Sequence, residues 1–128
     1  MEWTIERAHR GFLTVRTDGR FSVDDHRRMV EDILARGDWR PGTPVLFDNR
    51  RLDFGEVGIE AMHGAHENHR AHDAEVGGGR VAILMGSVAD FGTGRQFELL
   101  SEGHVQAQLR VFQQEEDAIR WLTDADRR

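Results

Sequence analysis

The sequence contains no lysine and no cysteine, and these two absences exclude several kinds of chemistry. Without lysine the chain cannot form a Schiff base, anchor pyridoxal phosphate or supply the phosphate-binding lysine of a P-loop. Without cysteine it has no thiol nucleophile, which agrees with a reducing compartment. All 17 cationic side chains are therefore arginines, which bind anions through a planar fork but transfer protons poorly.

Long hydrophobic runs are missing as well. The longest strictly apolar stretch is Val81 to Met85, far below the roughly 20 residues of a membrane-spanning helix. The first residues are of mixed polarity and do not resemble a signal peptide. The net charge of -6, without a run of basic residues, argues against nucleic acid as the main partner. We therefore expect a cytoplasmic protein with no membrane span.

The residues that are present fit one folded domain. The chain has 128 residues, of which 38% are hydrophobic and 31% are charged, and this is enough for a core without disulfides or a structural metal. No linker, repeat or low-complexity stretch divides the sequence. We expect a single domain over residues 1–128.

Alternating apolar and polar residues predict a β-hairpin at the start of the chain. The two strands are expected at residues 2–6 and 12–15, with the hairpin turn at residues 9–11. Asp18 and Gly19 then favour a second turn. This turn would lead the chain into its first helix.

The rest of the chain alternates between apolar runs and helical patterns. The runs Thr43–Phe47 and Val81–Met85 predict central parallel strands that are covered on both faces. Ser22 and Ser87 stand at capping-box spacing before helical patterns. The expected helices are residues 23–34, 56–76, 88–100 and 115–122, and the last expected strand is residues 108–112.

This order, ββαβαβαβα, predicts an α/β fold with a mostly parallel sheet flanked by helices in one layered domain. Gln108 and Arg110 interrupt the apolar pattern of the last strand, so we expect residues 108–112 at an edge of the sheet. An exposed edge strand or helix would also allow a homodimer, which the sequence does not decide.

In this order the chain resembles the SpoIIAA-like family, a STAS-like group whose fold is compared with the lipid-binding SEC14 or CRAL-TRIO domains. The resemblance covers nearly the whole chain and implies a STAS-like fold and a regulatory or ligand-binding module. Because its motifs are packing motifs, they specify the fold better than the function. They are GFLTV at residues 11–15, VLFD at 45–48, VAIL at 81–84, RVF at 110–112 and DAIRWL at 117–122.

One functional feature of the family is absent. In the anti-sigma-factor antagonists, a phosphorylatable Ser or Thr lies where the strand equivalent to residues 44–48 leads into its helix. The present chain has no hydroxyl-bearing residue from Val45 to Gly86. The resemblance therefore implies the fold without the kinase-controlled switch at this site.

Ligands of open α/β sheets bind outside the carboxyl ends of the parallel strands. Two segments, which we expect to be loops, follow these ends at residues 48–53 and 87–95. Their arginines could clamp a carboxylate or phosphate, helped by backbone amides and the flexible glycines of the second segment. The alternative is that Asp53 and Ser87 only cap helices and that the arginines pair with nearby acids. The candidate ligand-binding residues are Asp48, Asn49, Arg50, Arg51, Ser87, Asp90 and Arg95.

Four histidines, His63, His66, His69 and His72, follow one another at a spacing of three in one predicted helix. At about 100° per residue, positions three apart spiral across the helix, so that only neighbouring imidazoles can share an ion. His66 and His69 are the best metal pair, and they would need further ligands from elsewhere. We favour surface or boundary histidines, with His69 and His72 beside the buried stripe of the helix, His66 at its border and His63 towards solvent. If His69 or His72 is buried and neutral, acid should destabilise the fold.

Hydrolytic chemistry has little support in the sequence. Only three serines occur, and none lies in a Gly-x-Ser-x-Gly elbow. We therefore expect a non-enzymatic module of the SpoIIAA-like type, without a cofactor, that binds a protein partner or a small amphiphilic ligand. Trp39, in a polar loop, is expected in the core, or else over a pocket or a partner surface. The alternative is a metal-dependent or anion-processing enzyme centred on the His63–His72 helix and on Asp48, Arg50 and Arg95.

Overall fold

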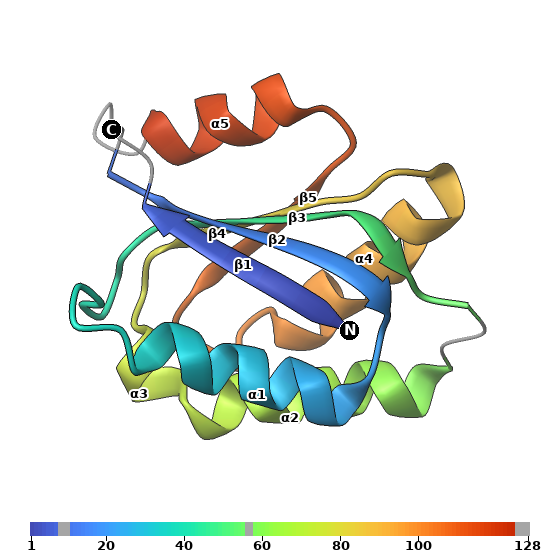
Figure 1. Ribbon diagram of the computed structural model, residues 1–128, viewed down its shortest axis with the longest axis horizontal. Coiled ribbons are helices and arrows are strands. Elements are labelled where there is room, and N and C mark those ends of the chain that lie inside the picture. The colour runs from blue at the N-terminus through green and yellow to red at the C-terminus, as the bar shows by residue number, and fades with distance from the viewer. Residues whose placement is uncertain (8–10, 56–57, 125–128) are drawn as a thin grey trace.

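The computed structural model describes residues 1–7, 11–55 and 58–124. These residues form a sheet of five strands in the order β1-β2-β3-β4-β5, with helices on both faces (Figure 1). The strands are β1 (Glu2–Arg7), β2 (Leu13–Arg20), β3 (Val45–Asp53), β4 (Arg80–Leu84) and β5 (Gln108–Phe112). The helices are α1 (Val23–Leu34), α2 (Ile59–Ala71), α3 (Asp73–Val76), α4 (Val88–Ser101) and α5 (Glu115–Thr123).

The sheet confirms the predicted fold class. β1 pairs antiparallel with β2, and the pairs β2–β3, β3–β4 and β4–β5 are parallel. β5 is the last strand of the sheet, as its interrupted apolar pattern predicts. The expected turn of the first hairpin and the start of the helix expected from residue 56 lie partly outside the described residues.

β2 and β3 are longer than their apolar runs predict. The turn expected at Asp18 and Gly19 is wrong, because β2 continues to Arg20, and the loop expected from residue 48 is strand as far as Asp53. The outer halves of the two strands pair with each other, with Asp18 opposite Arg51 after a register shift. This pairing satisfies backbone groups that a polar loop would expose to water.

Two serine caps fix the starts of helices. The Oγ of Ser22 accepts a hydrogen bond of 3.3 Å from the backbone N–H of Asp25, and the Oγ of Ser87 accepts one of 3.1 Å from Asp90. Both caps confirm the predicted helix starts. The helix expected over residues 56–76 is instead two helices, α2 and α3, which are separated at His72.

The central strands are buried on both faces. One face of the sheet is covered by α5, and we call it the α5 face. Apolar residues of the sheet and of α5 form one cluster there, and two further clusters lie on the opposite face, which α1, α2 and α4 cover. Figure 1 shows α5 on one side of the sheet and α1, α2 and α3 on the other. The α5 cluster consists of Phe12, Leu46, Ala82, Leu84, Ala118 and Leu122.

The glycines after α3 allow two loops to touch. A Cβ at Gly79 would lie 2.2 Å from the backbone oxygen of Gly42, and a Cβ at Gly77 would lie 2.5 Å from the nitrogen of Gly42. Gly77 also has a φ of +80°, which favours glycine. The sequence Gly77-Gly78-Gly79 therefore ends a helix, as predicted, and also brings the start of β4 against the chain that precedes β3.

Within the described ranges, no helix is both long enough and apolar enough to cross a membrane.

Candidate functional site

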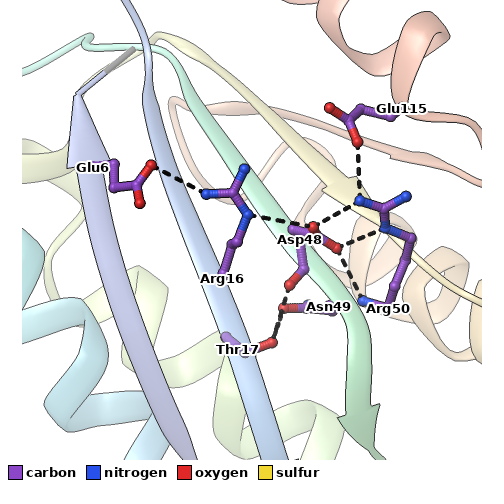
Figure 2. A network of polar contacts seen from close by, with 7 residues as sticks. All are labelled: Glu6, Arg16, Thr17, Asp48, Asn49, Arg50 and Glu115. Carbon is purple, nitrogen blue, oxygen red and sulfur yellow. Dashed lines mark hydrogen bonds and ion pairs between the residues drawn. The ribbon is translucent and has the colours of Figure 1, made fainter.

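Asp48 and Arg50 lie together on the α5 face of the sheet, as members of one polar network (Figure 2). The Nε and Nη2 of Arg50 each donate a 2.9 Å hydrogen bond to a different oxygen of Asp48. Nη2 also donates a 2.9 Å hydrogen bond to Glu115 of α5. On the other side, Arg16 lies 3.9 Å from Asp48 and 3.2 Å from Glu6 of β1.

The network holds three acidic side chains against two arginines and is bonded internally. The hydrogen bond from Arg50 holds the pKa of Asp48 below its usual range, and Asp48 in turn raises the pKa of Arg50. Thr17 donates a 2.7 Å hydrogen bond to the side-chain oxygen of Asn49. An added anion would compete with acids that Arg50 already binds, so this network has little positive charge to offer a ligand.

The other predicted site residues are placed apart from this network. Arg51 forms an exposed ion pair of 3.3 Å with Asp18, and Arg95 pairs with Glu98 inside α4. The structure thus brings Asp48, Asn49 and Arg50 together on β3. No hydrogen bond or ion pair among the described residues connects them to Arg95.

Two further expectations about these segments are wrong. The glycines around Thr93, expected in a flexible loop, lie inside α4, where the hydroxyl of Thr93 donates a 3.4 Å hydrogen bond to Ala89 O. Asp53 does not cap α2, whose N-cap is Gly58. Its carboxylate accepts a 2.8 Å hydrogen bond from Gly55 N. The helix predicted over residues 88–100 is thus the correct expectation for these glycines, whereas β3 extends through residues that are typical of a loop.

An internal cavity that the sequence did not predict lies on the opposite face of the sheet. It has a volume of about 100 Å³ and lies between the sheet and helices α1, α2 and α4. Its walls are apolar apart from four polar side chains. These four are His26, Asn49, His69 and Thr93.

Trp39 closes part of this cavity. Its side chain is buried and lines the cavity, and its Nε1–H donates a 2.8 Å hydrogen bond to the backbone oxygen of Glu75. The expectation that Trp39 lies in the core or over a pocket is therefore confirmed in both respects. Leu52 and Phe54 at the far end of β3 are also buried and line the same space.

Two imidazoles face the cavity and both are neutral near pH 7. His69 on α2 is 8% exposed, and its ring stacks on Phe97 with 6.4 Å between centroids. His26 on α1 lies with its ring centroid 6.3 Å from that of Phe97. Burial lowers the pKa of His69 to about 4, and burial together with the nearby His69 lowers the pKa of His26 to about 4.

The hydrogen bonds of the two imidazoles differ. The Nδ2 of Asn68 lies 3.0 Å from the backbone oxygen of Val23 and 3.0 Å from the Nδ1 of His26. A carbonyl oxygen only accepts, so the amide nitrogen must face it, and its second hydrogen points to His26 Nδ1. The Nε2 of His69 is buried and has no hydrogen-bond partner among the described residues.

The remaining histidines of α2 have separate surroundings. His66 is buried with its Nδ1 3.2 Å from the hydroxyl of Ser101, and burial lowers its pKa. His72 lies 2.9 Å from Glu75, and His63 is exposed, as expected. Among residues 1–7, 11–55 and 58–124, no group of three His, Asp or Glu side chains is placed to hold a metal ion. A metal on His66 and His69 is the alternative that the sequence does not favour, and among the described residues these two side chains have no third ligand placed with them.

The fold is SpoIIAA-like, and it is an α/β domain with a mostly parallel sheet. The structure is similar to that of an uncharacterised protein from the DUF3478 family with a SpoIIAA-like fold, from Shewanella loihica PV-4. The TM-score is 0.61 and the identity 23%, over 94% of this chain and 92% of that one. It is also similar to the unphosphorylated anti-sigma factor antagonist SpoIIAA, with a TM-score of 0.48 and 18% identity, over 94% of this chain and 96% of that one.

No protein-family model matches the sequence, and no curated protein matches it. The predicted resemblance is thus confirmed at the level of the fold, while the function has to be argued from the site itself.

Proposed function

We propose that this protein is a non-enzymatic binding module whose ligand occupies the cavity between the sheet and helices α1, α2 and α4. The observation that carries the proposal is the apolar space of about 100 Å³ beside a buried, unpartnered nitrogen of His69. Folded interiors pack closely and satisfy their buried polar groups, so both features together are typical of a binding site.

The size and lining of the cavity define what fits. An apolar cavity of roughly 150 Å³ in another protein binds benzene, so the present cavity suits one ring or a chain of about five carbons. The few polar side chains of the cavity wall can each form a hydrogen bond with a ligand. This combination favours a small amphiphilic molecule over a purely polar metabolite.

The serines support a module without catalysis. Ser22 and Ser87 accept hydrogen bonds as helix caps, and Ser101 is 2% exposed. A nucleophile has to reach its substrate, and none of these hydroxyls lines the cavity. The absence of any hydroxyl residue from Val45 to Gly86 further supports a ligand-controlled module over a phosphorylation-controlled one.

Binding of a small apolar probe tests the proposal. Ala65 of α2 is buried and lines the cavity, whereas Ala71 of the same helix is exposed. We expect toluene to shift backbone amide NMR signals around the cavity in the wild type and in Ala71→Leu. The variant Ala65→Leu, which fills the space, should lose these shifts. Absence of binding in the wild type, or equal binding in Ala65→Leu, would refute a ligand site here.

A protein partner is the second candidate, favoured by the outer face of α4. Val88 is 79% exposed and Leu99 is 55% exposed, and eleven residues apart they lie on one side of the helix. Sedimentation at increasing concentration tests whether this face joins two copies of the chain. We expect association to be weakened by Leu99→Arg. Wild-type protein that remains monomeric at every concentration would exclude the homodimer.

A further inference from the structure

We propose that the ligand carries a neutral hydroxyl group on a small apolar body, as phenol does, and that this hydroxyl is bound between His26 and His69. This inference rests on the proposed function, because it names the chemical class of the molecule that would fill the cavity. The ligand hydroxyl would accept a hydrogen bond from His26 and would form a second one with the Nε2 of His69.

The first argument is the unpartnered nitrogen of His69. It is on a side chain more than nine-tenths buried, in the wall of an apolar cavity, and no described residue bonds to it. The nitrogen is left to bond with a molecule that enters the cavity. A ligand group that bonds to the nitrogen therefore contributes more here than it would at an exposed histidine.

The second argument is the tautomer of His26. Because Asn68 donates to the Nδ1 of His26, the proton of the neutral imidazole lies on Nε2. His26 thus offers a donor, and the backbone oxygen of Val23 holds Asn68 in the orientation that fixes this tautomer. A hydroxyl oxygen can accept from this donor while its own hydrogen, or a second lone pair, satisfies His69 in either tautomer.

The third argument is the absence of charge around the two imidazoles. No arginine or acidic side chain is among the described residues that line the cavity. The amino terminus of Met1, whose residue also lines it, is paired with Asp25 at 3.3 Å. The titratable groups that act on His69 from outside the cavity wall are Asp73 of α3, His66 of the same helix and His72 between the two helices. A carboxylate or ammonium head would enter an apolar space without a counter-ion, whereas a hydroxyl enters uncharged.

The experiment compares phenol with toluene, which has a methyl group in place of the hydroxyl. We expect the wild type at pH 7.5 to bind phenol at least about tenfold more tightly than toluene, measured by NMR titration. Benzoate, of similar size but charged, should bind more weakly than either. Phenol, and not toluene, should shift the ring nitrogen signals of His26 and His69.

Variants of α2 assign the preference to one side chain. In His69→Leu we expect toluene to bind more tightly than phenol, while His63→Leu, at an exposed position of the same helix, should keep the wild-type preference. Equal binding of phenol and toluene in the wild type would overturn the hydroxyl proposal and leave the cavity as a ligand site. Failure of both probes to bind would overturn the proposed function itself. The ring nitrogen signals test the contact even if His69→Leu folds poorly.

Discussion

Protonation of His69 should make the stability of this protein depend on pH well above the range in which its carboxylates titrate. The folded pKa of His69 is lowered to about 4, while the unfolded chain has the ordinary value of 6.5. Between these two values the unfolded chain binds a proton that the folded chain does not bind. Stability from the neutral imidazole is therefore complete above about pH 7 and is lost as the pH falls toward 4.

The size of the effect follows from the two pKa values. At pH 5 the unfolded His69 is nearly fully protonated and the folded one nearly fully neutral, which lowers the free energy of unfolding by about 2 kcal/mol relative to pH 7.5. For a domain of this length, that corresponds to a decrease of roughly 5 to 10 °C in melting temperature. His26, with its pKa also lowered to about 4, contributes in the same direction.

Urea unfolding at pH 7.5 and pH 5, monitored by tryptophan fluorescence, measures this difference. We expect His69→Leu to reduce the pH dependence by about 2 kcal/mol, leaving the part that His26 and His66 supply. At pH 7.5 this variant should be at least as stable as the wild type, because it removes a buried nitrogen that has no partner. The matched control is His63→Leu, which changes an exposed imidazole of the same helix.

Two outcomes would refute the reasoning. A wild type equally stable at both pH values would show that neither buried imidazole has a lowered pKa. An equal loss of stability in the wild type and in His69→Leu would show that another group accounts for the effect. The carboxylate Asp38 cannot mimic it, because its pKa is lowered to about 2 and it titrates only below about pH 4.

Substitutions at three further positions test the fold. Gly79→Ala should destabilise by at least about 2 kcal/mol in urea unfolding, because its Cβ would overlap the oxygen of Gly42; a neutral result would mean that the two loops do not touch. Ser87→Ala should cost about 1 kcal/mol by loss of the α4 cap, and Ser87→Asp, which can also cap, should retain most of the stability. Asp48→Asn should cost about 1 kcal/mol at low salt and less at high salt, because its main partner Arg50 is partly exposed; a loss that does not change with salt would argue against an electrostatic role.

The central part of the fold could be predicted from the sequence because local and tertiary signals agree there. The runs at Val45 and Val81 are apolar on both faces, which is required of a parallel strand covered by helices on both sides. Ser22 and Ser87 have caps that depend only on nearby backbone groups. In these places a short window of sequence contains the whole physical cause of the structure.

The outer halves of β2 and β3 could not be predicted in this way. Asp18, Gly19 and the residues from Asp48 to Asp53 are polar or flexible, and each segment read alone favours a turn or loop. They are strands because they lie beside each other, and because the polar face of β3 forms its own network of ion pairs there. Pairing between segments more than 30 residues apart produces no local sequence pattern in either segment.

The cavity could not be predicted from the sequence, for a related reason. Its lining comes from the sheet, from four helices and from the Trp39 loop, so no single motif marks it. Of the predicted ligand-binding residues, only Asn49 lines it. The one local signal was His69, expected at the edge of the buried stripe of its helix, and its empty hydrogen-bonding position depends on the whole tertiary structure.

The cavity and the imidazole both lower the stability of the free protein, and this links the fold to the proposed function. Enclosed volume costs about 24 cal/mol per Å³, so a partly open cavity of about 100 Å³ costs at most about 2.4 kcal/mol. An unsatisfied buried nitrogen adds about 1 to 3 kcal/mol. Together these are a large part of the roughly 5 to 15 kcal/mol by which such domains are stable. A ligand that fills the space and bonds to His69 would remove both costs, so ligand binding and folding stability should rise together. Ala65→Leu separates the two, since it should stabilise the free protein by up to about 2 kcal/mol while abolishing the stabilisation by phenol.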